Sequence, residues 1–452
     1  MELTIAEVQA ATAAEIIRGG ACATDVRVSG WSIDSRTVGP GDLFFAIKGD
    51  VYDGHDFVTA ALENNAAAAV VMQEVAGYAG PLLRVSDTVN ALKATAHAAR
   101  NKWARTIVGI TGSAGKTSTK DIVADLLSAR LRVGRTVGNL NNHLGLPLSI
   151  LRMPEHAEVG VLEMGMNHAG EIRELARIAE PQVGVVTNVG YAHVEAFDSI
   201  EGVAAAKREL IEALPETGVA VLNADDGRVL RFREKHRGRT ITYGFSDRAD
   251  IRAIEVESGP AGSDFTVDGV RFHTSLAGRH SVSNILAGLA VARVFGIELR
   301  DLIERVAALR PAKMRGERVS RGGVTILNDS YNSNPEAARS MIDVLRAEPA
   351  RRRIAVLGEM LELGQMAERL HRDVGAYAAK AGVDVLVGVC GVSRFTVEEA
   401  VKAGLDSHAA LFFEDPESAG SFLRGFVKAG DAILFKGSRG THVEKALARM
   451  EA

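Results

Sequence analysis

The sequence predicts an α/β protein made of three regions, and three observations support this prediction. The chain has 452 residues, which is more than a single hydrophobic core usually supports. From about residue 104 onwards, short apolar runs alternate with helical patterns, as in a parallel sheet with helices on both faces. A glycine-rich turn follows the first of these runs, at the kind of position where open α/β sheets bind ligands.

The first region, residues 1–103, mixes strand-like runs at 43–47 and 68–72 with Gly/Asp turns. It ends in an alanine-rich stretch that predicts a helix over about 89–102.

The second region, residues 104–313, begins with a β-branched run at 106–111. A helix is predicted over 119–131, because apolar residues recur there on one helical face. A stretch at 251–274 alternates apolar and polar residues and predicts a hairpin insertion. Further strands are predicted at 159–163, 183–188 and 218–223.

The third region, residues 314–452, repeats the strand and helix alternation. Its strands are predicted at 354–357, 383–389 and 432–435, and the sequence shows no internal repeat.

Composition argues against several classes of function. The formal net charge is −4, and without a dense Lys/Arg run we expect no binding to nucleic acid through its phosphates. The N-terminus lacks the pattern of a signal peptide, and no apolar stretch is long enough to span a membrane. Cys22 and Cys390 match no zinc or redox spacing, so we interpret them as core residues in a reducing compartment. These features predict a cytoplasmic protein.

The turn Gly112-Ser113-Ala114-Gly115-Lys116-Thr117-Ser118 predicts a nucleotide-binding loop. Glycines allow the backbone N–H groups to point at phosphate oxygens, and the following helix adds its N-terminal dipole. Lys116 is placed to reach the terminal phosphates, and the Thr117 hydroxyl is placed to bind Mg²⁺. The strict motif has a further glycine where Ile110 stands, so this is a shortened form. A flexible surface turn is the alternative, but the strand before the turn and the helix after it favour nucleotide binding.

Two more residues at predicted strand ends have side chains suited to a metal. Glu163 ends the strand 159–163, where a carboxylate can bind Mg²⁺ that is also held by phosphates. His193 follows the strand 183–188 and is expected at the same edge of the sheet. Lys207 is ambiguous, because the pair Arg208 and Glu212 at i,i+4 also fits a lysine on a helix surface.

The chain resembles the Mur ligases of peptidoglycan synthesis along nearly its whole length. Within that family, the string Asp329-Ser-Tyr331-Asn332-Ser-Asn334-Pro335 resembles the branch that adds D-alanyl-D-alanine. Met314 stands where relatives commonly have glycine, and Ser281 where asparagine is frequent. The other matching segments begin at Asp34, Gly41, Asp53, Thr111, Thr136, Glu163, Thr187, Asn223, Gly278 and Lys436.

The resemblance implies three domains: residues 1–103 bind the UDP-sugar end of a substrate, 104–313 form a P-loop-type ATPase domain, and 314–452 form a Rossmann-like domain. It implies a monomer that uses ATP and Mg²⁺ to join D-alanyl-D-alanine to UDP-N-acetylmuramoyl-tripeptide through an acyl phosphate. Both steps gather negative charge near the transferred phosphoryl group, so cations and hydrogen-bond donors matter most. The third residue of the tripeptide stays open between meso-diaminopimelate and lysine.

The resemblance also implies roles for individual residues. Lys116, Glu163, His193 and Lys207 are expected to be catalytic. Thr117 and Glu163 are expected to hold one Mg²⁺, and His193 and a carbamylated Lys207 a second. The implied ATP contacts are Asn284, Arg315, Asp329, Tyr331 and Asn332, and the implied substrate contacts are Ser35, Asn139, Asn141 and Asn142 for the UDP-sugar-peptide and Ser438 and Arg439 for the dipeptide.

Two alternatives remain at this point. A folylpolyglutamate synthase would use the same loop but is not expected to carry the Asp329–Pro335 string. A P-loop switch or motor would hydrolyse ATP without an amine acceptor and would not need the outer regions to resemble those of a ligase.

Overall fold

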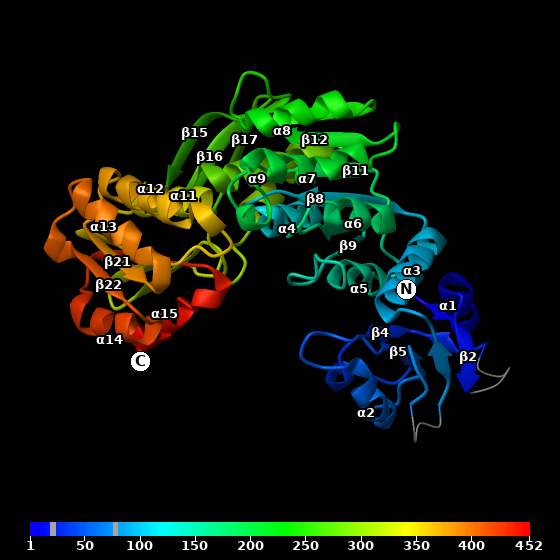
Figure 1. Cartoon of the computed structure of the whole chain (residues 1–452). Helices are drawn as coiled ribbons and strands as arrows, with labels where there is room; N and C mark the ends of the chain where they lie inside the picture. Colours follow the sequence, from blue (N-terminus) through cyan, green and yellow to red (C-terminus); the bar gives the residue numbers. More distant parts are fainter. Residues whose placement is uncertain (19–23, 76–79) are drawn as a thin grey trace.

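The computed structural model describes residues 1–18, 24–75 and 80–452. Three bodies follow one another along the chain, with the central one between the other two (Figure 1). Among the described residues, no helix is long and apolar enough to cross a membrane. The predicted core role of Cys22 concerns a residue outside the described part of the chain. Cys390 is a free, partly buried thiol, and burial raises its pKa.

The N-terminal body contains a mixed sheet whose described strands run in the order β2-β7-β6-β5-β4. Only β2 is antiparallel to its neighbour. The long helix α3 links this body to the next and packs on α5 and α6. The elements are β1 Leu3–Thr4, α1 Ile5–Thr12, β2 Glu15–Arg18, β3 Arg27–Val28, β4 Gly30–Ser32, η2 Ser35–Thr37, β5 Asp42–Phe45, η3 Gly54–Phe57, α2 Val58–Glu63, β6 Ala68–Val71, β7 Leu82–Arg84 and α3 Thr88–Trp103.

Within residues 80–452, which are all described, the central sheet has seven parallel strands in the order β14-β13-β12-β11-β8-β10-β9. The chain leaves β8 towards β9 and later crosses to β11, so the strand order reverses at β8, where α/β sheets bind ligands. The first elements are β8 Thr106–Thr111, α4 Lys116–Leu127, β9 Val133–Arg135, α5 Gly145–Leu151, β10 Val159–Glu163, α6 Glu171–Ala179, β11 Val183–Val186, η4 Val194–Ala196, α7 Ile200–Glu212 and β12 Val219–Asn223.

Both faces of the central sheet are buried, as the apolar strand sequences predict. Val108 and Ile110 pack with α4 and α9, whereas Ile107 faces the core formed with α5, α6 and α7. The predicted hairpin insertion is a three-stranded antiparallel sheet, β15-β16-β17. The remaining elements are α8 Gly227–Leu230, η5 Arg231–Lys235, β13 Arg239–Gly244, β14 Ile251–Arg252, β15 Ile254–Gly259, β16 Gly262–Val267, β17 Val270–Thr274, α9 Arg279–Val294, η6 Leu299–Leu302 and α10 Ile303–Ala308.

The C-terminal sheet, in the same described range, has the order β18-β19-β23-β20-β21-β22. Only its edge strand β18 is antiparallel. Helices α14 and α15 cover one face, and α11 and α12 cover the other. Adjacent strands β19 and β23 end at Asp329 and Lys436, which are register partners.

The bounds of the C-terminal elements are β18 Glu317–Arg321, β19 Val324–Asp329, α11 Pro335–Ala347, β20 Arg352–Gly358, η7 Gly364–Met366, α12 Ala367–Lys380, β21 Val385–Val389, η8 Gly391–Ser393, α13 Arg394–Lys402, η9 Ser407–Ala409, β22 Ala410–Phe413, α14 Pro416–Phe426, β23 Asp431–Lys436, η10 Arg439–Thr441 and α15 Glu444–Glu451. The three largest sheets divide the described chain near residues 103 and 313, and we propose 1–103, 104–313 and 314–452 as its domains.

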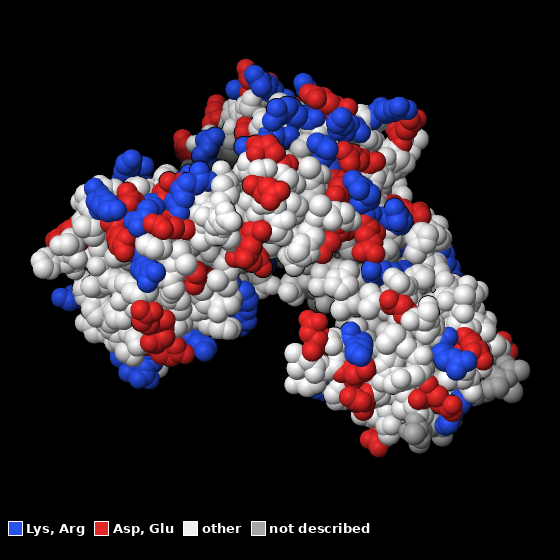
Figure 2. Space-filling model, viewed as in Figure 1, with Lys and Arg blue, Asp and Glu red and all other residues white. Residues whose placement is uncertain are grey.

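Charge is mixed on the face shown in Figure 2, where Lys and Arg alternate with Asp and Glu over all three bodies. The same view shows the molecule hollowed between the N-terminal and C-terminal bodies, beneath the central one.

Candidate active site

A cavity of about 970 Å³ lies between the central and C-terminal bodies. It is formed where the carboxyl ends of the two parallel sheets face each other, so residues far apart in sequence meet there. Most residues predicted for the site line it: Ser113, Ala114, Gly115, Lys116, Thr117, Ser118, Asn139, Asn141, Asn142, Glu163, His193, Asn284, Arg315, Asp329, Tyr331, Asn332 and Arg439.

The predicted phosphate loop connects β8 to α4, and its two glycines are required by close contacts. Gly112 has φ +152°, and a Cβ there would lie 1.8 Å from Thr187 Oγ1. Gly115 has φ +79°, and a Cβ would lie 2.6 Å from Asn284 Oδ1. Any larger residue would push the loop away from its neighbours.

The loop is fixed by hydrogen bonds to the segment that follows β11. Ser113 Oγ donates to Gly190 O at 3.0 Å and accepts from Gly190 N at 2.8 Å. Ala114 N donates to Asn188 Oδ1 at 2.8 Å, and Ala114 O accepts from Thr187 Oγ1 at 2.7 Å. These hydrogen bonds within the protein therefore fix the shape of the loop without a bound phosphate.

Lys116 is a cation that forms no ion pair in the described part of the chain. Its Nζ donates to Gly112 O at 2.8 Å. Burial lowers its pKa, whereas the nearby Glu163 carboxylate acts in the opposite direction. A bound phosphate would supply the missing counter-charge at this position.

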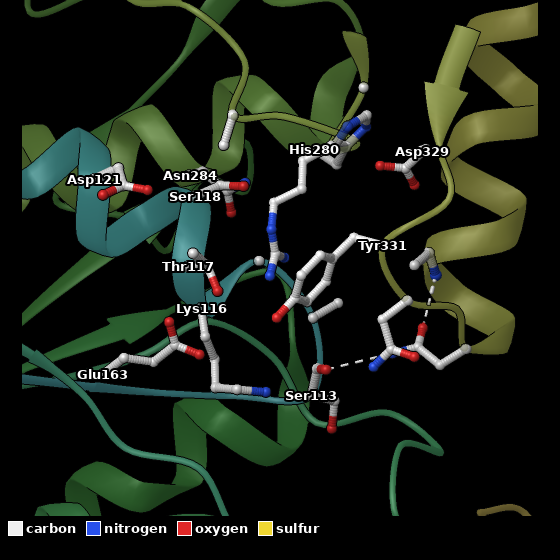
Figure 3. Close-up of a pocket in the computed structure, with 18 of the residues that line it drawn as sticks. Ser113, Lys116, Thr117, Ser118, Asp121, Glu163, His280, Asn284, Asp329 and Tyr331 are labelled. Atoms are coloured by element: carbon white, nitrogen blue, oxygen red, sulfur yellow. Dashed lines mark hydrogen bonds between the residues drawn. The ribbon is translucent and has the colours of Figure 1, made fainter. Parts of the chain in front are cut away.

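Glu163 has one carboxylate oxygen held and one left open. It is 2% exposed at the end of β10, and its Oε1 accepts from Asn141 Nδ2 at 2.7 Å. Its Oε2 is buried without a hydrogen-bond partner. In Figure 3, Glu163 lies beside Lys116 and below Thr117. A buried carboxylate oxygen without a donor fits a cation.

The residues at this edge of the central sheet fit a Mg²⁺ ion that takes its other ligands from the nucleotide. Within residues 1–18, 24–75 and 80–452, no three His, Cys, Asp or Glu side chains gather into a metal site. Mg²⁺ commonly takes one or two carboxylates together with substrate phosphates and water. Glu163 and the Thr117 hydroxyl match that small protein contribution.

His193 lines the cavity, but its Nδ1 faces the C-terminal body. Nδ1 lies 2.5 Å from Glu362 Oε2, on the loop after β20. The imidazole beside it holds the pKa of the Glu362 carboxyl below its usual value. The sequence offered no sign of this pairing, because the two residues are far apart in the chain.

Lys207 is not a surface residue of α7. It is 1% exposed and forms no hydrogen bond or ion pair among the residues described. Burial, and then the positive charge of Lys116, lower its pKa well below the usual value. It lies behind the cavity lining, near Lys116. The surface-lysine interpretation considered from Arg208 and Glu212 is therefore wrong for Lys207, although Arg208 does pair with Glu212 at 2.7 Å.

On the C-terminal side, the charged groups of the cavity come from the ends of β19 and β23 and from two arginines. Lys436 Nζ lies 2.5 Å from Asp329 Oδ2. Arg315 stacks over the Tyr331 ring at 3.9 Å from its centroid, and Arg439 lies 5.9 Å from the same centroid. Figure 3 shows Tyr331 and Asp329 across the cavity from Lys116. An aromatic ring between two guanidinium groups can hold a flat or anionic ligand.

Besides Lys207, three predicted site residues lie away from the cavity lining. Gly112 sits beneath the loop. Ser438 is 3% exposed, and its Oγ accepts from Leu361 N at 2.9 Å and donates to Ser333 O at 3.4 Å. Ser35 lies in the N-terminal body, where its carbonyl oxygen accepts from Asn64 Nδ2. The substrate roles of Ser35 and Ser438 stay predictions.

Several residues at the site were not singled out from the sequence. His280, which lines the cavity, has a pKa lowered by burial. Glu336, also in the lining, has a pKa raised by burial, and its carboxylate accepts from Tyr191 N at 3.3 Å. His280, Glu336 and Lys436 belong to segments that carry the family resemblance, which is the signal that marks them, but no role was predicted for them. Glu362 had no such signal.

Comparisons with known proteins identify the family. Family models match residues 27–104 (Mur ligase family, catalytic domain), 110–292 (Mur ligase middle domain) and 314–439 (Mur ligase, glutamate ligase domain). A Bacillus subtilis protein named UDP-N-acetylmuramoyl-tripeptide--D-alanyl-D-alanine ligase is 34% identical over 424 residues, 92% of each chain. The chain belongs to the Mur ligase family. The family resemblance inferred from the motifs is thereby confirmed.

Solved structures agree with this Mur ligase assignment. MurF from Acinetobacter baumannii matches with a TM-score of 0.92 at 29% identity, covering 100% of this chain and 99% of that one. MurF ligase from Thermotoga maritima, solved in complex with ADP, matches with a TM-score of 0.84 at 30% identity, covering 94% and 97%. The predicted α/β architecture, with a central parallel sheet flanked by two smaller domains, is therefore confirmed.

Proposed function

We propose that the protein is an ATP-dependent ligase that joins D-alanyl-D-alanine to UDP-N-acetylmuramoyl-tripeptide. The products are ADP, phosphate and the pentapeptide precursor of peptidoglycan. One observation carries this proposal: a single cavity joins the phosphate loop to the arginines of a second domain. An ATPase needs only the loop, whereas a ligase also needs room and charge for an acceptor. The Bacillus subtilis relative bears this activity in its name.

The first chemical step activates a carboxylate. The terminal carboxylate of the tripeptide attacks the γ-phosphorus of ATP, the bond to the bridging oxygen breaks, and ADP leaves. Negative charge develops on the phosphoryl oxygens during this step. The Lys116 ammonium and the loop N–H groups other than those of Ser113 and Ala114, which donate to Asn188, would stabilise that charge, and the fixed loop would do so with little reorganisation.

The second step forms the amide. The dipeptide amine attacks the acyl carbon, and the tetrahedral adduct expels phosphate as the amine loses its proton. Arg439 is placed to pair with the carboxylate of the dipeptide, which suits a guanidinium. Its side chain is 58% exposed, so it can adjust to an incoming ligand. Ser438 is proposed to support Arg439 through the backbone turn that they share.

Thr117 and Glu163 would hold one Mg²⁺, and His193 and a carbamylated Lys207 a second. These ions would neutralise phosphate charge during transfer. A neutral lysine amine is the form that reacts with carbon dioxide, and the lowered pKa of Lys207 favours it. A carbamate would also supply the oxygen donors that Mg²⁺ prefers.

The remaining contacts divide between the substrates. Asn284, Arg315, Asp329, Tyr331 and Asn332 would contact ATP, since they line the same cavity as the phosphate loop. Asn139, Asn141 and Asn142 would contact the sugar-peptide, and Ser35 its UDP end. The hollow between the outer bodies in Figure 2 suits a substrate that reaches from one to the other. We propose a cytoplasmic protein, because ATP and UDP-linked precursors occur in that compartment. The family resemblance further implies a monomer.

The two alternatives receive less support. A folylpolyglutamate synthase does not account for the Asp329–Pro335 string, whose Asn334 Nδ2 donates to the phosphate-loop carbonyl of Ser113 at 3.3 Å. A P-loop switch or motor does not account for family models of a ligase over residues 27–104 and 314–439.

The test is to follow phosphate release with enzyme, Mg²⁺-ATP and UDP-N-acetylmuramoyl-tripeptide. Separate reactions receive D-alanyl-D-alanine, D-alanine, L-lysine, meso-diaminopimelate or L-glutamate. We expect phosphate release only in the reaction that receives D-alanyl-D-alanine. Equal turnover with a single amino acid would overturn the proposed acceptor, and turnover without any amine would overturn the ligase proposal.

A further inference from the structure

Two parallel strands of the C-terminal sheet end side by side in a charged pair at the cavity. Asp329 ends β19 and Lys436 ends β23, and the two residues are register partners. Their side chains therefore leave the sheet on the same face, at its carboxyl edge. Lys436 Nζ lies 2.5 Å from Asp329 Oδ2, and both residues line the cavity. The end of one strand thus holds the side chain at the end of the other.

Lys436 is a buried cation with two fixed acceptors. It is 2% exposed, and besides Asp329 its Nζ contacts the backbone, donating to Asn332 O at 3.0 Å. An ammonium removed from water needs such partners, because burying an unpaired charge is costly. Lys436 therefore fixes both the carboxylate and the turn that carries Tyr331.

The Asp329 carboxylate has one oxygen held and the other free. Oδ2 takes the Lys436 ammonium, whereas Oδ1 accepts no hydrogen bond from any described residue. The side chain keeps 18% of its surface exposed. Figure 3 shows Asp329 across the cavity from Lys116, with His280 beside it. Within the described chain no hydrogen bond joins Asp329 to His280, so Lys436 is the group that sets the direction of Oδ1.

A free carboxylate oxygen selects hydrogen-bond donors in a ligand. The triphosphate of ATP offers only negative oxygens, which a carboxylate repels, and the phosphate loop lies on the opposite wall of the cavity. The donors that ATP does offer are the two ribose hydroxyls and the amino group of adenine. A carboxylate at the position of Asp329 therefore fits the nucleoside part of the nucleotide.

We propose that Lys436 is a positioning residue that holds Asp329 Oδ2 and thereby presents Oδ1 to a hydrogen-bond donor of the nucleoside. The inference rests on the proposed function, in which Asp329 contacts ATP. Without the Lys436 ammonium, the carboxylate would lose its paired cation and would be free to turn away from the nucleotide. Lys436 would thus act on nucleotide binding through Asp329.

The decisive variant is Lys436→Met, which keeps the length of the side chain and removes its charge. Lys436→Gln, which keeps a hydrogen-bond donor without the charge, is a second variant. Lys93→Met is the matched control, because Lys93 pairs with Glu174 at 2.7 Å and neither residue lines the cavity. Asp329→Ala reports the loss of the carboxylate itself.

The probes are ADP and three analogues that each lack one donor: 2′-deoxy-ADP, 3′-deoxy-ADP and purine riboside diphosphate. Isothermal titration calorimetry with Mg²⁺ present gives a dissociation constant for each. We expect the wild type and Lys93→Met to bind at least one analogue about tenfold more weakly than ADP, as for the loss of a hydrogen bond to a charged group. In Lys436→Met and Lys436→Gln, that penalty should fall to about threefold or less. The analogue that carries the penalty identifies the donor.

The ratio of two dissociation constants does not depend on how much of a variant is folded, because the calorimetric stoichiometry reports that fraction separately. If Lys436→Met and Lys436→Gln keep the wild-type penalty while Asp329→Ala loses it, the inference is overturned alone. If the wild type binds every analogue as tightly as ADP, or if Asp329→Ala keeps the penalty, the nucleoside contact of Asp329 fails and the inference fails with it. These titrations need no ligation, so a failure of the proposed ligase activity would appear in the phosphate-release assay and not in them.

Discussion

The two walls of the cavity are built differently. On the central side, the phosphate loop is held by a network to Thr187, Asn188 and Gly190, and Glu163 is held by Asn141. On the C-terminal side, Arg439 has a side chain 58% exposed, and its nearest acidic partner, Glu444, is 3.4 Å away. The central wall is preorganised, whereas the C-terminal wall combines a held Lys436–Asp329 pair with an exposed, adjustable Arg439.

This difference fits the two chemical steps. Phosphoryl transfer needs donors already in place, because reorganising them during the reaction would raise the barrier. Capture of the dipeptide can use a mobile cation that settles on a carboxylate when it arrives. Substitutions on the central wall should therefore lower kcat, and substitution of the adjustable Arg439 should chiefly raise the KM for the acceptor.

The largest expected effect is that of Lys116→Ala. Removing the cation that we propose to contact the γ-phosphate should lower kcat by at least about a hundredfold. The fold should persist, because Lys116 makes one hydrogen bond and no ion pair within the described residues. Phosphate release and thermal unfolding check the two parts, with the exposed Lys235→Ala as a control. Near-native turnover would contradict the proposed role of the phosphate loop in phosphoryl transfer.

Lys207 lies behind the central wall of the cavity. We expect it to carry a carbamate, because a buried ammonium near Lys116 and a metal would be repelled by both. Enzyme prepared in ¹³C-bicarbonate with nucleotide and Mg²⁺ should show a carbamate carbon signal that Lys207→Met lacks. Lys207→Met should lose most activity yet remain folded, since the buried Lys207 side chain forms no hydrogen bond or ion pair among the described residues. A ¹³C spectrum without that signal, or high-resolution density for a plain ammonium, would contradict the prediction.

On the C-terminal wall, Arg439→Ala should raise the KM for D-alanyl-D-alanine about tenfold or more. Loss of one charge-assisted pair typically costs about 1.5–3 kcal/mol. The KM for ATP should change little, because the loop does not depend on Arg439. Steady-state kinetics with each substrate varied in turn check this split, and Arg424→Ala on the far helix α14 is a control. An unchanged acceptor KM would remove the carboxylate-clamp role.

The sequence predicted the central wall more completely than the C-terminal wall. The strands β8 and β10 were predicted at their exact bounds, because a parallel strand buried on both faces is a continuous apolar run. Loop residues and Glu163 follow directly from those strand ends. The pairings His193–Glu362 and Lys436–Asp329 could not be predicted, because they join segments separated by more than a hundred residues. The edge strand β22 was also missed, since its residues are only partly buried.

The smallest expected effect is that of substituting Met314, which tests the difference between the two walls of the cavity most closely. The Met314 backbone has φ +59°, a left-handed conformation that favours glycine. Its carbonyl oxygen accepts from Tyr331 N at 3.2 Å, and its sulfur lies 4.0 Å from Arg439 Nη1. The side chain thus occupies a strained position from which it contacts the mobile arginine.

Two variants at Met314 separate the strain from the contact. Met314→Ala removes the sulfur but keeps the Cβ that opposes a left-handed backbone, whereas Met314→Gly removes both. We expect Met314→Gly to be more stable than Met314→Ala by about 1 kcal/mol, because relief of strain exceeds the extra flexibility of the unfolded glycine chain. Both should raise the acceptor KM two- to threefold by the same amount, since both free Arg439, and neither should change the KM for ATP. Chemical denaturation and kinetics check the pair. An equal stability of the two variants would show that the backbone at residue 314 is not strained, and a change confined to the ATP KM would place Met314 with the preorganised wall instead.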